Sequence, residues 1–209
     1  MLVVVSLLAL GLGIERSAGF ESLEQDLKRV ESVLHSAVPF KVLVGEDLIF
    51  REAARAVQEC GDSEVIRATG ISPSPGASGT EKQYQREYLL ALVERIQRAK
   101  ERGGSLSYRW VIADVGSERK RRILKRRVRA FTDKGILDRF LVREFAHTWP
   151  MEMLIAGNVV VIGFSGLTTG ALTFRVGVST ADSSFAWHMA QWYDDFLWTT
   201  SQVLEASEV

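Results

Sequence analysis

Residues 153–166 read MLIAGNVVVIGFSG, and this stretch decides how the second half of the chain folds. Two apolar runs, 153–156 and 159–164, flank the pair Gly157-Asn158. Both residues of the pair tolerate the positive φ angles that a two-residue hairpin turn requires. The stretch therefore predicts two neighbouring antiparallel strands joined by a tight turn.

Helical and strand patterns alternate upstream of this hairpin. The sequence predicts a helix at 46–59, a strand at 64–69, a helix from Thr80 to Gly103, a strand at 106–112, a helix at 117–135 and a strand at 136–145. After the hairpin it predicts a strand at 171–178 and a helix at 181–204, with Phe185, Met189, Trp192, Phe196 and Val203 facing inward.

Strands that helices separate pair in parallel, whereas the later strands form a hairpin or meander. The expected fold class is therefore α/β, with a single mixed β-sheet and helices on both faces. The expected order is β-α-β-α-β-β-β-α, preceded by an N-terminal helix.

The composition is that of a globular protein and excludes several kinds of site. The 209 residues include 26 Lys and Arg and 26 Asp and Glu, so the net charge is zero and implies no bulk electrostatic partner. Cys60 is the only cysteine, which excludes an internal disulfide and a multi-cysteine zinc site. His35, His147 and His188 form no ligand-spaced pair, so we expect no metal site and no cofactor.

The first fourteen residues, MLVVVSLLALGLGI, are almost wholly apolar. A spanning helix needs about 20 apolar residues, and a secretory signal needs positive charge ahead of its apolar core. Three interpretations stay open: a short membrane anchor, the remnant of a longer transmembrane region, and a signal peptide or buried helix. Arg16, Lys28 and Arg29 follow the segment and favour a membrane-associated protein whose globular domain is cytoplasmic.

Residues 15–39 are expected to form a juxtamembrane helix. Apolar residues recur there at the spacing of a short coiled coil, at Leu23, Leu27, Val30 and Leu34. The pattern fits a homodimer or another protein partner, and it equally fits a helix that packs on its own domain. Pro39 ends the helix, and residues 40–209 form the globular domain.

Two phrases of this domain, AKERGGSLSYRWVI at 99–112 and the hairpin at 153–166, resemble one half of the phospholipase D-like fold. Members of that family typically have a helix that ends in Ala-x-x-Arg-Gly, followed by a strand, a helix and a strand. A hairpin of two apolar runs that ends in Gly-Ser comes next. The resemblance covers about residues 64–198 and implies a phospholipase D-like α/β domain.

The family's chemistry resides in a His-x-Lys-x4-Asp motif on the first hairpin strand, where His attacks phosphorus and Lys stabilises the developing charge. When Gly163 is matched to the family's Gly-Ser glycine, Trp149 stands at the His position and Met151 at the Lys position. Residues 148–157 contain no His, Lys or Asp, and His147 has no Lys two positions on. The resemblance therefore implies a degenerate relative that lacks the nucleophile.

These observations favour a membrane-associated, non-catalytic phospholipase D-like module for ligand sensing or protein interaction. The alternative is a phosphodiesterase or nuclease with a non-standard site, so whether the chain is an enzyme stays open. The candidate ligand cleft lies at the strand ends beside the Gly- and Ser-rich loop 70–79. Its residues are Thr69, Trp149, Met151, Phe164 and Ser165.

Residues 119–129, RKRRILKRRVR, carry eight basic side chains in eleven positions. The candidate phosphate-binding residues are Arg119, Arg122, Lys125, Arg126 and Arg129. They suit anionic lipid or nucleic-acid phosphates, although the segment has no interleaved aromatic residue to stack on bases, so nucleic acid is not the expected partner. A solvated helix face and a protein-binding face are the alternatives.

Overall fold

The computed structural model describes residues 39–70, 82–113, 118–146, 151–169 and 172–204. The apolar segment 1–14 and all of the expected juxtamembrane helix except Pro39 lie outside these residues. Within the described ranges, no helix is both long enough and apolar enough to span a bilayer.

Eight strands of the described chain form one sheet: β1 (Phe40–Val44), β2 (Val65–Thr69), β3 (Ser107–Ala113), β4 (Phe140–Phe145), β5 (Met151–Ala156), β6 (Val159–Thr169), β7 (Leu172–Thr180) and β8 (Gln202–Val203). Their order across the sheet is β1-β7-β6-β5-β2-β3-β4-β8. Strands β2, β3 and β4 are parallel neighbours, and the other neighbouring pairs are antiparallel. The expectation of a single mixed sheet is confirmed.

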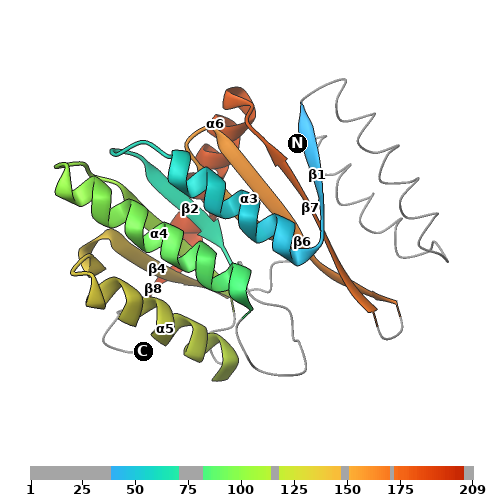
Figure 1. Cartoon of the computed structure of the whole chain (residues 1–209), viewed down its shortest axis with the longest axis horizontal. Coiled ribbons are helices and arrows are strands. Elements are labelled where there is room, and N and C mark those ends of the chain that lie inside the picture. The colour runs from blue at the N-terminus through green and yellow to red at the C-terminus, as the bar shows by residue number, and fades with distance from the viewer. Residues whose placement is uncertain (1–38, 71–81, 114–117, 147–150, 170–171, 205–209) are drawn as a thin grey trace.

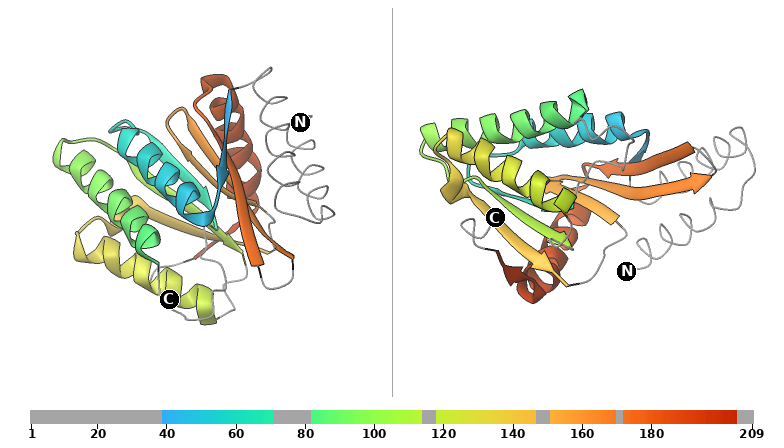
Figure 2. Two further views of the ribbon diagram at one scale, coloured as in Figure 1. Left: turned by 45° about the vertical axis from the view of Figure 1, so that its right-hand side comes forward. Right: turned by 90° about the horizontal axis from the view of Figure 1, so that it is seen from below.

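Helices cover both faces of this sheet (Figures 1 and 2). One face carries α3 (Glu46–Glu59), α4 (Gln83–Glu101) and α5 (Glu118–Asp133), and the other carries α6 (Ser183–Trp192) with the π-helix η2 (Tyr193–Trp198). Alternate residues of β3 serve the two sides, since Tyr108 and Trp110 pack under the first layer and Val111 packs under α6. The alternation gives the domain two apolar cores.

The hairpin predicted from residues 153–166 is present as β5 and β6. Gly157 has a φ of 57° at the turn, as the Gly-Asn pair predicted. The pairing runs from Ala156 opposite Val159 to Met151 opposite Phe164. A register irregularity then follows between Phe164 and Leu167.

Several expected boundaries were wrong. Strand β1 was not predicted; it pairs with β7 at one edge of the sheet. The long helix begins at Gln83, where Lys82 and Gln85 form the capping box, and Thr80 lies outside the described residues. The strand expected from residue 136 begins at Phe140, because a 3-10 turn at Leu137–Arg139 precedes it.

The C-terminal helix departs most from the expected pattern. Its segment Tyr193–Trp198 is a π-helix, which holds more residues per turn than an α-helix and so rotates the inward face, and helical backbone continues only to Thr200. Tyr193 and Leu197 are buried there, whereas Phe196, expected inside, is 45% exposed. Val203, also expected inside, lies in β8 and is exposed.

The hydroxyl of Thr69 joins the two halves of the sheet. Backbone pairing of β2 with β5 covers Arg67 opposite Ile155 and Ala68 opposite Leu154. Beyond that point, the Thr69 hydroxyl accepts a hydrogen bond from the Met153 amide at 2.9 Å and donates to the Met151 carbonyl at 3.3 Å. The Thr69 side chain thus extends the hydrogen bonding between β2, in the parallel part of the sheet, and β5, in the hairpin.

Replacing Thr69 with Val, which has nearly the same shape, is expected to lower the free energy of unfolding by about 2–3 kcal/mol. The change removes two hydrogen bonds and leaves buried backbone groups without partners. Thr69→Ser keeps the hydroxyl and is expected to cost about 1 kcal/mol for the lost methyl group. Urea denaturation of both variants measures the difference. A Thr69→Val protein as stable as the wild type would show that these bonds contribute nothing.

Candidate functional site

Three of the five predicted cleft residues come together at one end of the sheet. Thr69 is the last residue of β2, Met151 is the first residue of β5, and Phe164 stands opposite Met151 in β6. Thr69 and Met151 are buried, and Phe164 packs half-buried against the same core as Met151. Trp149 lies outside the described residues, and Ser165 belongs to β6 but its side chain is not described.

The chemical groups of these three residues are poorly suited to phosphoryl transfer. The Thr69 hydroxyl uses both its proton and a lone pair on the backbone of β5. Met151 offers a thioether and Phe164 a ring. A nucleophilic mechanism at phosphorus also needs a positive group near the attacked oxygen, and none of the three residues supplies one.

Charged side chains lie on the same face of the sheet, under η2, beginning two residues before Thr69 in β2. Arg67 of β2 stands opposite Arg109 of β3, and both bind Asp194 of η2. The distance from Arg67 Nη2 to Asp194 Oδ2 is 2.7 Å, and that from Arg109 Nη1 to Asp194 Oδ1 is 3.1 Å. This cluster was missed by the sequence analysis. The isolated arginines in two apolar strands were a signal, but only the strand register shows that they are neighbours.

Trp198, at the end of η2, contacts a third arginine, Arg143, as well as Arg109. The guanidinium carbons of Arg109 and Arg143 lie 5.2 Å and 4.5 Å from the centre of the indole ring, within the range of cation–π attraction. Tyr193 fixes the start of η2, because its hydroxyl lies within hydrogen-bonding distance of the Ala68 and Arg109 carbonyls. The π-helix thus presents Asp194 and Trp198 to strands β2, β3 and β4.

Cys60 lies at the opposite end of β2 and is not a plausible nucleophile. Burial and a hydrogen bond to Glu64 raise the pKa of the thiol to about 12. At neutral pH the group is therefore a thiol, which is far less reactive than a thiolate.

Helix α5 separates its basic residues into two groups. Arg122, Lys125, Arg126 and Arg129, four of the predicted phosphate-binding residues, are exposed, while the side chain of Arg119 is not described. Arg127, which was not among the predicted phosphate-binding residues, is buried. Its guanidinium carbon lies 4.1 Å from the centre of the Trp110 ring, and the group donates to the Tyr108 hydroxyl. Arg127 therefore anchors α5 to the sheet.

The described residues contain no group of three or more His, Cys, Asp or Glu side chains that could hold a metal ion. His188 is exposed on α6, where Nδ1 lies 2.7 Å from the Ser184 carbonyl. His147 lies outside the described residues.

No protein-family model and no curated protein sequence matches the chain. Solved structures do match it. Phosphatidylserine synthase from Haemophilus influenzae is similar with a TM-score of 0.55 and 12% identity over 86% of this chain. The archaeal chromatin protein TrmBL2 is similar with a TM-score of 0.51 and 15% identity over 88% of this chain. The phospholipase D family member Nuc from Salmonella typhimurium, with a TM-score of 0.48 and 16% identity, matches 79% of this chain and 99% of its own.

This chain spans only part of the first two structures, 43% of the synthase and 64% of the chromatin protein. At these identities the likeness concerns the fold, which can carry unrelated functions. The strand order, the helices on both faces and the folds of the synthase and of the chromatin protein agree with the resemblance seen in the sequence. The domain has a phospholipase D-like fold.

Proposed function

We propose that this chain is a non-catalytic phospholipase D-like module that binds a ligand or a protein partner at a membrane. The observation that carries the proposal is Met151 at the start of β5. The resemblance seen in the sequence equates Met151 with the cationic Lys of the family, and the Met151 side chain is buried in the apolar core under α6. The resemblance also aligns Trp149 with the nucleophilic His of the family, and an indole cannot act as that nucleophile.

The surroundings of Met151 support the same proposal. The Thr69 hydroxyl, which donates to the Met151 carbonyl, is committed to the backbone of β5. The arginines on this face do not replace the missing Lys, because Arg67 and Arg109 are tied to Asp194 under η2. A phosphodiester at this strand end would meet apolar groups where the transition state needs positive charge.

Membrane association is the second element of the proposal. It rests on the apolar segment 1–14 and on the exposed basic face of α5. Each Lys or Arg near an anionic leaflet contributes about 1 kcal/mol to binding, so this face adds to the attachment that the short segment provides. Of the four exposed residues, Arg122 and Arg129 also make weak ion pairs along the helix, at 4.0 Å and 3.8 Å.

The first test is hydrolysis of bis(p-nitrophenyl) phosphate by the purified full chain. We expect no release of nitrophenol above the buffer rate, because Thr69, Met151 and Phe164 offer no free nucleophile and no cation for the reaction. His147→Ala and His188→Ala serve as matched variants, since these are the two histidines of the globular domain. Hydrolysis by the wild type that either substitution abolishes would contradict the proposal.

The second test is flotation of the full chain with vesicles of phosphatidylcholine and phosphatidylserine. We expect the wild type to float, and Leu8→Arg to remain in the dense fraction, because an arginine in the middle of an apolar helix costs about 2.5–3.5 kcal/mol. The double change Arg122→Gln and Arg129→Gln is expected to reduce flotation at low salt only, since salt screens exposed charges. A wild-type chain that stays dense at every salt concentration would remove membrane association from the proposal.

A further inference from the structure

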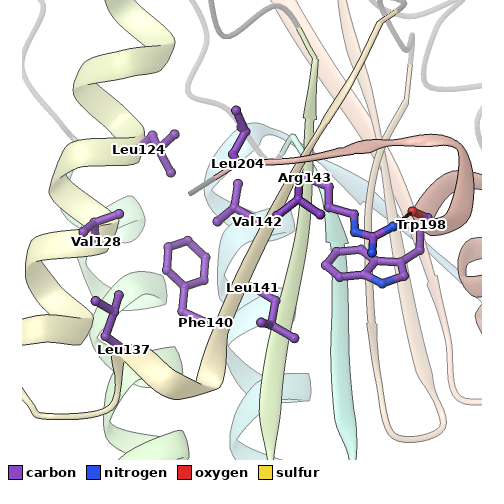
Figure 3. Close-up of a pocket in the computed structure, with 10 residues that line it drawn as sticks. Leu124, Val128, Leu137, Phe140, Leu141, Val142, Arg143, Trp198 and Leu204 are labelled. Carbon is purple, nitrogen blue, oxygen red and sulfur yellow. Dashed lines mark hydrogen bonds between the residues drawn. The ribbon is translucent and has the colours of Figure 1, made fainter. Parts of the chain in front are cut away.

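A groove runs along the free edge of the sheet, between α5 and η2, where β4 is covered only in part by β8 (Figure 3). Its volume is about 360 Å³. Nine of its ten lining residues are apolar, among them Val128 of α5, Phe140 and Val142 of β4, and Trp198 of η2. Pockets of this size with apolar walls and very few polar groups are typical of small-molecule sites.

Arg143 is the only charged residue that lines the groove. Its guanidinium group donates to the Trp198 carbonyl and lies against the Trp198 ring (Figure 3). Within the described part of the chain, no carboxylate forms an ion pair with Arg143. Most of its five N–H donors therefore remain available at one end of an apolar groove.

The charge around Trp198 is unbalanced. Arg67, Arg109 and Arg143 bring three guanidinium groups to this face, and Asp194 brings one carboxylate. Arg109 Nε is buried without a hydrogen-bond partner among the described residues. Like charges in a half-buried place repel each other more strongly than in water, so a bound anion would be stabilised there.

Part of the apolar lining of the groove is exposed to solvent. Leu141 of β4 is 43% exposed and Val203 of β8 is 60% exposed, and both line the groove. A volume of about 360 Å³ lies near the lower end of the range for small-ligand pockets, about 300–1,000 Å³. This volume suits one small ligand with a single short chain.

We propose that this groove binds a small anionic amphiphile, a molecule with one acidic head and an apolar body of about ten carbons. The head, a carboxylate or a phosphate, lies at Arg143, in a cluster whose three guanidinium groups outnumber its one carboxylate. The body lies along the open edge of β4 beside Leu141 and Val203, which share one face of the sheet with Arg143. Strand β3 separates this groove from the strand end at Thr69 and Met151, so the inference is independent of whether the module is catalytic.

The test is isothermal titration of the full chain with decanoate and with decyl phosphate, each below its micelle-forming concentration. Decanol supplies the same body without a charge, and acetate supplies the head without a body. We expect both amphiphiles to bind, the tighter one identifying the head group, and both controls to bind at least tenfold more weakly. Equal affinity for decanol would overturn the role of the arginines, and no binding of either amphiphile would overturn the site.

Arg143→Gln is expected to weaken binding about tenfold or more, which is the value of one charge-assisted hydrogen bond. Arg51→Gln removes the same charge from the exposed face of α3, away from the groove, and is expected to leave the affinity within about twofold. Because Arg143→Gln could disturb the packing of Trp198, the pair Val203→Asp and Val203→Lys provides a second measurement at an exposed position. The Asp variant should bind more weakly and the Lys variant more tightly; equal affinities for the two would overturn the proposal.

Discussion

The Thr69 hydroxyl, together with the backbone pairing of β2 and β5, joins the parallel half of the sheet to its antiparallel half. The candidate site lies where those halves meet. On one side of β2, parallel strands and their helices form a layered block; on the other, an antiparallel hairpin and meander complete the sheet. The hydroxyl bonds to the Met153 amide and the Met151 carbonyl, so it fixes the start of β5 at the residue that the sequence resemblance aligns with the family's Lys. The group that fixes the strand is therefore unavailable for chemistry.

Elements with strong local signals were predictable from sequence. The hairpin at β5 and β6 followed from a Gly-Asn pair between apolar runs, and α3 and α5 lie within a residue or two of their expected bounds. The π-helix was not predictable, because the extra residue per turn arises from contacts such as that of Tyr193 with β2 and β3, which no local pattern encodes. Strand β1 is short, and its pairing with β7 joins segments over 130 residues apart.

The candidate site was predictable in part for the same reason. The resemblance placed Thr69, Met151 and Phe164 at one strand end, and the strand pairings bring these three together. Arg67, Arg109 and Arg143 could not be grouped from sequence, since their proximity depends on the register of three strands and on the place of Trp198. The basic run of α5 also hid the burial of Arg127 under Trp110, which a charge count does not reveal.

The non-catalytic proposal requires that the strand end at Thr69 and Met151 is an apolar junction and binds no phosphoryl group. A crystal structure of the full chain grown with orthovanadate, an analogue of the phosphoryl transition state, tests this most directly. We expect Thr69 to be bonded to the β5 backbone and no vanadate to lie within hydrogen-bonding distance of it. A vanadate bound beside Thr69 and contacted by the imidazole of His147 would contradict the proposal.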